Sequence, residues 1–140
     1  MTAAIYLIDT SGLFRILGDK YRQEWTEELA AGVIATCPAV ELEFLYSARS
    51  LADRLEKQRL LRTVFGWVPM TERAYERAQE VQQMLTEQGK HRSAGPVHLL
   101  IAATAEREGL AVLSDDRDFR TVASVTGQPV RFVSDFPGSR

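Results

Sequence analysis

Aspartates stand directly after two apolar segments that lie far apart in the sequence. Asp9 follows the apolar run 5–8, and Asp116 and Asp118 follow the apolar run 110–113. In an open parallel sheet the ligand crevice lies outside the carboxyl ends of the strands, so these side chains are expected to converge. Close carboxylates repel one another unless a cation lies between them. The pattern therefore predicts a divalent metal site.

A glutamate in the stretch 40–45 is a further candidate ligand. Glu41 and Glu43 both have apolar neighbours, which makes it difficult for both side chains to remain in water. Glu41 stands early in a predicted helix, where it could instead complement the helix dipole. We favour Glu43 as the residue that points inward, with Glu41 as its rival.

Each aspartate also has a purely structural interpretation. Asp9 could cap a helix that begins just after it, because Asp is a preferred N-cap residue. Asp115, Asp116 and Asp118 could form a solvated turn, although three acids after a buried strand are more than a turn requires. We take Asp116 as the first ligand candidate of this loop and Asp118 as the second. Asp115 is expected to face solvent.

The elements that would position these residues follow from the pattern of apolar side chains. Short β-type runs alternate with helical patterns, which predicts an α/β fold built from βαβ units. The fold expected is a central, mostly parallel sheet of about five strands flanked by helices. Strands are expected near residues 4–8, 33–36, 65–68, 110–113 and 130–133.

Helices are expected in the intervals between these strands. Residues 20–31 predict one helix, and the region after Pro38 predicts a long helix that is interrupted near Ser50. Residues 71–87 predict another, ended by Gly89.

The most apolar helical stretch is 97–105, which follows Pro96. Proline is favoured at the first position of a helix, so the helix should begin there and be the most buried of the chain. His98 then lies in its first turn, where the helix dipole disfavours a protonated imidazole.

Composition and charge exclude several classes of protein. The chain has 140 residues, of which 45% are hydrophobic and 26% charged, without repeats or linkers, so one domain spanning 1–140 is expected. No apolar run approaches the roughly 20 residues that cross a bilayer, and the N-terminus does not resemble a signal peptide. The lone Cys37 fits a reducing compartment, so the protein is expected in the cytoplasm and not at a membrane. A net charge of -2 neither supports nor excludes an RNA substrate.

Four stretches, at residues 8–11, 43–46, 99–105 and 116–119, together resemble a PIN domain. Within that family the chain resembles the VapC-type ribonuclease toxins of bacterial type II toxin-antitoxin systems. The resemblance implies that Asp9, Glu43, Asp116 and Asp118 hold Mg²⁺ or Mn²⁺, with Ser11 and Thr10 in support. The stretches that carry it span nearly the whole chain.

One position departs from the pattern of the family. The third acid of a PIN domain belongs at the start of the buried helix, where this chain has His98. The change removes a negative charge and a hard oxygen ligand that suits Mg²⁺, whereas a neutral imidazole still binds Mn²⁺. We expect His98 to substitute imperfectly in the catalytic site, with weakened Mg²⁺ binding and reduced activity. A packed or hydrogen-bonded histidine is the structural alternative.

The resemblance implies a metal-dependent endoribonuclease that cleaves tRNA or another structured RNA. A cognate VapB-like antitoxin would inhibit it, and a homodimer is expected. Arg92 and Lys90 precede the buried helix and are candidates to bind the phosphates of the substrate. Because of His98, the alternative is a catalytically inert PIN-fold protein that captures an antitoxin or RNA.

Basic residues outnumber acidic ones in the helical segment 49–62. They form either a stripe that binds an RNA backbone or an ordinary solvated helix face. The basic residues are Arg49, Arg54, Lys57, Arg59 and Arg62, against the acids Asp53 and Glu56.

Overall fold

A sheet of five parallel strands forms the centre of the computed structural model, which describes residues 3–137. The spatial order of the strands is β3-β2-β1-β4-β5, and all neighbours pair in parallel. Each strand overlaps its predicted range, and the predicted α/β fold class is confirmed. The strands are β1 (Tyr6–Ile8), β2 (Ile34–Thr36), β3 (Gly66–Trp67), β4 (Ala111–Ser114) and β5 (Val130–Phe132).

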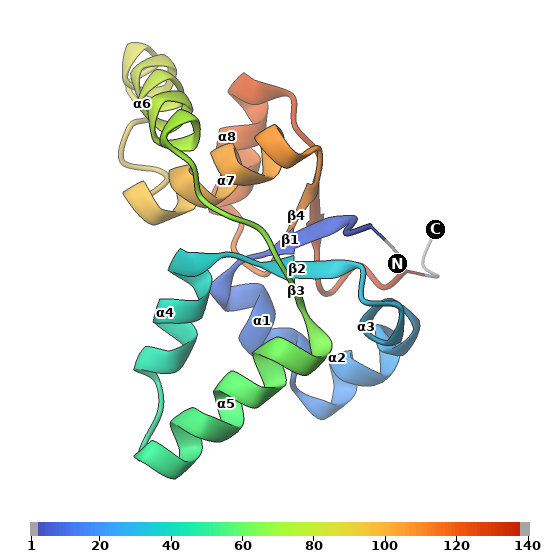
Figure 1. The fold of residues 1–140 in the computed structure, drawn as a ribbon. Helices are drawn as coiled ribbons and strands as arrows, with labels where there is room; N and C mark the ends of the chain where they lie inside the picture. Colours follow the sequence, from blue (N-terminus) through green and yellow to red (C-terminus); the bar gives the residue numbers. More distant parts are fainter. Residues whose placement is uncertain (1–2, 138–140) are drawn as a thin grey trace.

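Helices cover both faces of the sheet. Figure 1 shows α6, α7 and α8 on one side and α1, α2, α3 and α5 on the other. The chain first steps outward from β1 to β3 and then returns to β4 and β5, so the order of the strands reverses beside β1. The helices are α1 (Thr10–Ile16), α2 (Asp19–Glu24), α3 (Thr26–Ala31), α4 (Pro38–Tyr46), α5 (Leu51–Val64), α6 (Glu72–Glu87), α7 (Pro96–Glu108) and α8 (Asp118–Thr126).

The core lies on both faces of the interior strands of the sheet. Leu7 and Ile8 of β1 and Val112 and Leu113 of β4 are fully buried, as expected for a parallel sheet with helices on both faces. Helix α7 begins at Pro96, as predicted, and buries six residues, more than any other helix between residues 3 and 137. None of the helices in this range is long and apolar enough to cross a membrane.

The single helix predicted over residues 20–31 is wrong. Helices α2 and α3 meet at Trp25, whose backbone angles (φ -110°, ψ 17°) leave the helical region. The indole of Trp25 is fully buried, and its Nε1–H donates to the Val133 carbonyl oxygen at 2.9 Å. The break thus coincides with a long-range anchor, in a segment whose local pattern favours one continuous helix.

The predicted interruption of the helix after Pro38 is confirmed. Helix α4 ends at Tyr46, and Ser50 caps the start of α5 by accepting a hydrogen bond from the Asp53 backbone N–H at 3.1 Å. Helix α8 lies between β4 and β5, in an interval where a helix was expected but given no bounds. It begins at Asp118, so this residue opens a helix and does not belong to a turn.

Candidate active site

The predicted site lies where the strand order reverses, at the carboxyl ends of β1 and β4. Asp9 directly follows β1, and Asp116 stands two residues beyond the end of β4. A cavity of about 480 Å³ opens at this edge, with walls from α1, α4 and the start of α7. Its lining residues are Asp9, Thr10, Ser11, Phe14, Glu43, Gly95, Pro96, Val97, His98 and Ile101.

Asp9 both caps α1 and lines the cavity. The side chain is 2% exposed, and its Oδ1 accepts a hydrogen bond from the Gly12 N–H at 2.8 Å. The Ser11 hydroxyl lies 3.0 Å from each carboxylate oxygen. Burial raises the pKa of Asp9, although the hydrogen bonds from Gly12 and the serines oppose the rise. A cation beside Asp9 would favour its ionised form.

Gly12 allows α1 to approach β4 closely. A Cβ atom at this position would lie 2.8 Å from the Leu113 carbonyl oxygen and 3.1 Å from Asp9 Oδ1. Only a residue without a side chain fits here unless the backbone shifts. The glycine therefore sets the position of Asp9 relative to the end of β4.

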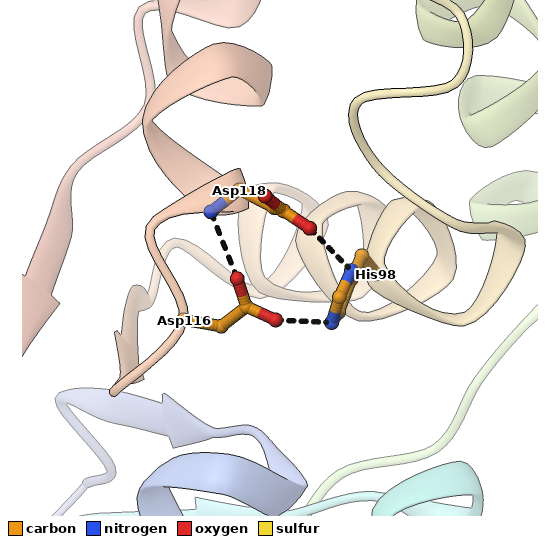
Figure 2. A group of neighbouring side chains, drawn as sticks. All are labelled: His98, Asp116 and Asp118. Atoms are coloured by element: carbon orange, nitrogen blue, oxygen red, sulfur yellow. Dashed lines mark hydrogen bonds and ion pairs between the residues drawn. The ribbon is translucent and has the colours of Figure 1, made fainter.

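His98, Asp116 and Asp118 form a compact cluster (Figure 2), with one possible ligand atom from each within 4.8 Å of the others. His98 Nε2 lies 3.2 Å from Asp116 Oδ2, and His98 Nδ1 lies 4.0 Å from Asp118 Oδ2. The Asp118 backbone N–H donates to Asp116 Oδ1 at 2.9 Å, which holds the two aspartates together. The structure thus brings His98 to Asp116 and Asp118, although the three come from different helices and a loop. Asp9 and Glu43 are not part of this cluster, and they share only the cavity lining with His98.

One ring nitrogen of His98 has no hydrogen-bond partner among the described residues. Nδ1 is buried and makes no hydrogen bond within the described part of the chain, and the ring packs edge-on against Phe119 at 4.9 Å between centroids. A nitrogen donor beside carboxylate oxygens fits a divalent cation that accepts mixed ligands, such as Mn²⁺, better than one that requires oxygen. Of the two ions that the resemblance implies, the donor set therefore fits Mn²⁺ better than Mg²⁺.

Glu43, and not its rival Glu41, lines the cavity. Glu43 Oε1 accepts a hydrogen bond from the Thr10 hydroxyl at 2.7 Å, which links α4 to α1. Glu41 instead accepts from the Thr36 hydroxyl at 2.8 Å. Glu43 was favoured as the residue that points inward, and it does line the cavity, but its side chain is exposed, whereas Glu41 is half-buried.

Two serines connect the ends of β1 and β4. The hydroxyl oxygens of Ser11 and Ser114 lie 3.3 Å apart, and Ser114 Oγ accepts from the Asp116 N–H at 2.8 Å. The sequence interpretation missed Ser114, although its place before the acids was the available signal. Asp115 was expected to face solvent, but it is half-buried. Its Oδ2 lies 3.6 Å from Arg15 Nε, and its backbone N–H donates to Ser11 Oγ at 3.2 Å.

The structure does not bring Lys90 and Arg92 to the cavity. Both residues are exposed in the connection between α6 and α7, and neither belongs to the cavity lining. Their predicted contact with phosphate therefore applies to substrate outside the cavity, and it stays a prediction.

Comparison with known proteins identifies the family. The model of the PIN domain family matches residues 6–125. Ribonuclease VapC21 of Mycobacterium tuberculosis is 36% identical over 128 residues, covering 91% of this chain and 93% of that protein. Ribonuclease VapC2 of the same species is 33% identical over 142 residues, covering 99% of both chains.

Solved structures agree on the fold. The crystal structure of DNA-bound VapBC from Salmonella typhimurium matches with a TM-score of 0.76 at 18% identity, over 93% of this chain and 98% of that one. VapBC2 from Rickettsia felis, bound to a promoter DNA fragment, matches with a TM-score of 0.72 at 16% identity, over 91% and 96%. Since the sequence relatives and these folds agree over almost the whole chain, the chain belongs to the PIN domain family and, within it, to the VapC type.

Proposed function

We propose that this chain is a metal-dependent endoribonuclease that serves as the toxin of a toxin-antitoxin pair. One observation carries the proposal: a chain 36% identical to a VapC ribonuclease gathers acids and a histidine around one cavity where the strand order reverses. Acids at this edge of a parallel sheet are positioned to act on a ligand bound in the crevice. The antitoxin is inferred because the structural neighbours are complexes of VapC with VapB.

Mg²⁺ or Mn²⁺ would be held by Asp9, Asp116 and Asp118, with Glu43 and His98 completing the set. When bound, such an ion neutralises charge on the scissile phosphate and lowers the pKa of water. His98 belongs both to the cavity lining that contains Asp9 and Glu43 and to the cluster with Asp116 and Asp118, which supports one shared site for these residues.

The protein contributes fixed geometry to this reaction. Gly12 and Ser11 hold the Asp9 carboxylate through hydrogen bonds of 2.8 and 3.0 Å, so its orientation does not depend on the substrate. Thr10 holds one oxygen of Glu43 at 2.7 Å, which leaves Oε2 to accept a hydrogen bond from the attacking water. Positioned groups of this kind lower the entropic part of the barrier.

Substrate and partners follow the family. The substrate class is tRNA or another structured RNA, and Lys90 and Arg92 bind phosphates beyond the cavity. The active form is a cytoplasmic homodimer that a VapB-like antitoxin inhibits. His98 lowers the activity, because it replaces an oxygen ligand and places Nε2 3.2 Å from Asp116.

A second candidate function is favoured by the same histidine. If the contact between the imidazole and the Asp116 carboxylate prevents a cation from binding there, the chain is an inert PIN-fold protein. It would then bind its antitoxin or RNA without cleaving RNA. Such a protein would bind its partner equally well with and without divalent cations.

Cleavage of a total tRNA pool separates the two functions. The purified chain is incubated with EDTA, Mg²⁺ or Mn²⁺, beside Asp9→Asn, which retains the helix cap but not the charge, and His98→Asp. Metal-dependent cuts that disappear in Asp9→Asn support the nuclease, and stronger cuts in His98→Asp support attenuation by His98. Cleavage by His98→Asp alone would assign the inert function to the natural chain. Absence of cleavage in every variant and every metal would contradict the nuclease.

A further inference from the structure

Phe14 is an exposed aromatic residue between two cavities. Its side chain is 46% exposed, although it is large and apolar. It lines the cavity that contains Asp9 and Glu43, and it also lines a neighbouring cavity of about 510 Å³. The other residues of the second cavity are Ser47, Arg49, Ser50, Asp53 and Lys57. One ring thus forms a wall of both cavities.

The ring of Phe14 is held in place from one side. It packs against Phe44, which is 2% exposed, with 5.2 Å between centroids and 57° between planes. Phe14 lies one helical turn after Thr10 on α1, and Thr10 binds Glu43. Helices α1 and α4 are therefore joined at two places, by Thr10 with Glu43 and by Phe14 with Phe44. Because Phe14 already packs against a buried ring, its side chain loses little conformational freedom when a ligand stacks on it.

The charged side chains that line the two cavities on either side of the Phe14 ring have opposite net sign. The first cavity contains the carboxylates of Asp9 and Glu43. In the second cavity two cations, Arg49 and Lys57, face one anion, Asp53, which leaves one positive charge in excess. Asp53 lies 3.0 Å from Lys57 Nζ and accepts the backbone N–H of Arg49 at 3.0 Å. The exposed Arg49 side chain is thus the cation best placed to meet an external phosphate.

We propose that Phe14 stacks on an unpaired nucleobase of the RNA substrate and that Arg49 binds the phosphate beside that base. The inference rests on the proposed nuclease function and names the substrate feature that its site selects. Single-stranded RNA presents bases and phosphates in alternation, and stacking on aromatic side chains is a common way to bind its bases without reading the sequence. A base inside a duplex has no free face for Phe14, so the site selects an unpaired nucleotide next to the cleaved bond.

The lining of the second cavity favours RNA over an apolar protein segment. Beyond Phe14 the residues are hydroxyl-bearing or charged. Such a lining matches a sugar-phosphate backbone, whereas an amphipathic helix requires an apolar groove for its anchor residues.

The test measures binding in EDTA, where metal-dependent cleavage cannot occur. A fluorescein-labelled RNA of about 12 nucleotides is titrated with the chain, single-stranded or annealed to its complement, and followed by anisotropy. Phe14→Leu should weaken single-strand binding by about 5-fold to 150-fold, which corresponds to the stacking of one base. Duplex binding should not change. Phe14→Tyr keeps the ring and should bind like the natural chain.

Salt dependence separates the base contact from the phosphate contact. Arg49→Gln should reduce the slope of log affinity against log salt by about 0.7, the value for one phosphate of a single strand. Phe14→Leu should leave this slope unchanged. Thermal melts establish that each variant is folded.

Three outcomes would overturn the inference. They are equal single-strand affinity of Phe14→Leu and the natural chain, an equal loss for single strand and duplex, or weakened antitoxin binding with unchanged RNA affinity. If the natural chain cleaves RNA but Phe14→Leu binds normally, only the stacking role fails. If the natural chain neither binds nor cleaves RNA, the proposed function fails as well.

Discussion

Replacing His98 with aspartate tests the electrostatics of the cluster without relying on RNA. The substitution places a third carboxylate beside Asp116 and Asp118, whose oxygens lie 3.2 and 4.0 Å from the imidazole nitrogens. In the absence of a divalent cation these three charges repel one another. We expect His98→Asp to lower the stability of the metal-free protein and to increase its stabilisation by metal.

The size of the effect follows from distance and exposure. Two unit charges about 4 Å apart repel by about 1 kcal/mol in water and by about 4 kcal/mol at an effective dielectric constant of about 20. The side chains of His98, Asp116 and Asp118 are 26%, 31% and 51% exposed, so solvent screens much of this repulsion. Two new pairs should therefore destabilise the metal-free protein by about 2–4 kcal/mol. For a chain of this length that lowers Tm by roughly 8–15 °C.

A bound divalent cation should restore the stability that His98→Asp loses. A ligand present at about 100 times its Kd stabilises the folded state by about 2.7 kcal/mol, and a tighter complex stabilises it further at the same concentration. Thermal melts in EDTA, Mg²⁺ and Mn²⁺ give the response of each variant. The natural chain should respond more to Mn²⁺ than to Mg²⁺, and His98→Asp should gain most in Mg²⁺, because a hard oxygen replaces nitrogen.

His98→Asn is the matched control, because it has the size of aspartate without its charge. It should leave the metal-free stability close to that of the natural chain and should not strengthen Mg²⁺ binding. The reasoning is refuted if His98→Asp and His98→Asn melt at the same temperature in EDTA, or if the Mg²⁺ response of His98→Asp does not exceed that of the natural chain.

Three further substitutions test individual contacts. Burial raises the pKa of Asp9 above 3.8, so the metal-free chain should lose stability relative to Asp9→Asn as pH rises through this raised pKa. Urea unfolding of both proteins at acidic and neutral pH measures this, and a stability difference between them that does not change with pH would contradict it. Trp25→Phe removes the donor to the buried Val133 carbonyl and should lower the free energy of unfolding by about 1–3 kcal/mol, and an unchanged urea midpoint would exclude this role. Gly12→Ala would place a Cβ 2.8 Å from the Leu113 carbonyl oxygen, so it should lower the free energy of unfolding by about 1–3 kcal/mol. It should also reduce the rise in Tm that Mn²⁺ produces, and an unchanged rise would show that α1 can shift without disturbing the site.

The elements that could be predicted from sequence are those with local signals. The strands before Asp9 and Asp116 are short, apolar and followed by polar residues, and proline marks the start of α7. The break between α2 and α3 could not be predicted, because no local signal marks it and it coincides with the hydrogen bond from Trp25 to Val133, 108 residues away. Local periodicity contains no information about such a contact.

The same distinction applies to the candidate site. Asp9 and Asp116 were accessible to prediction because parallel strands place their carboxyl ends at one edge of the sheet. The hydrogen bond between Thr10 and Glu43 depends on how α1 packs against α4, and the link between Ser11 and Ser114 depends on the missing side chain of Gly12. These contacts arise from tertiary packing, which a single sequence does not display.

His98 also bears on how the cluster remains folded without a cation. Asp9 is almost fully buried, and burial disfavours its charge, so the site already opposes ionisation at one carboxylate. An acid at position 98 would add repulsion to Asp116 and Asp118, whereas the imidazole makes an attractive or neutral contact with both. We therefore expect the histidine to favour a stable metal-free protein over tight Mg²⁺ binding. Each carboxylate added at this edge of the sheet lowers the stability of the metal-free protein by repulsion. A bound cation removes that repulsion, so the same change increases the affinity for the cation.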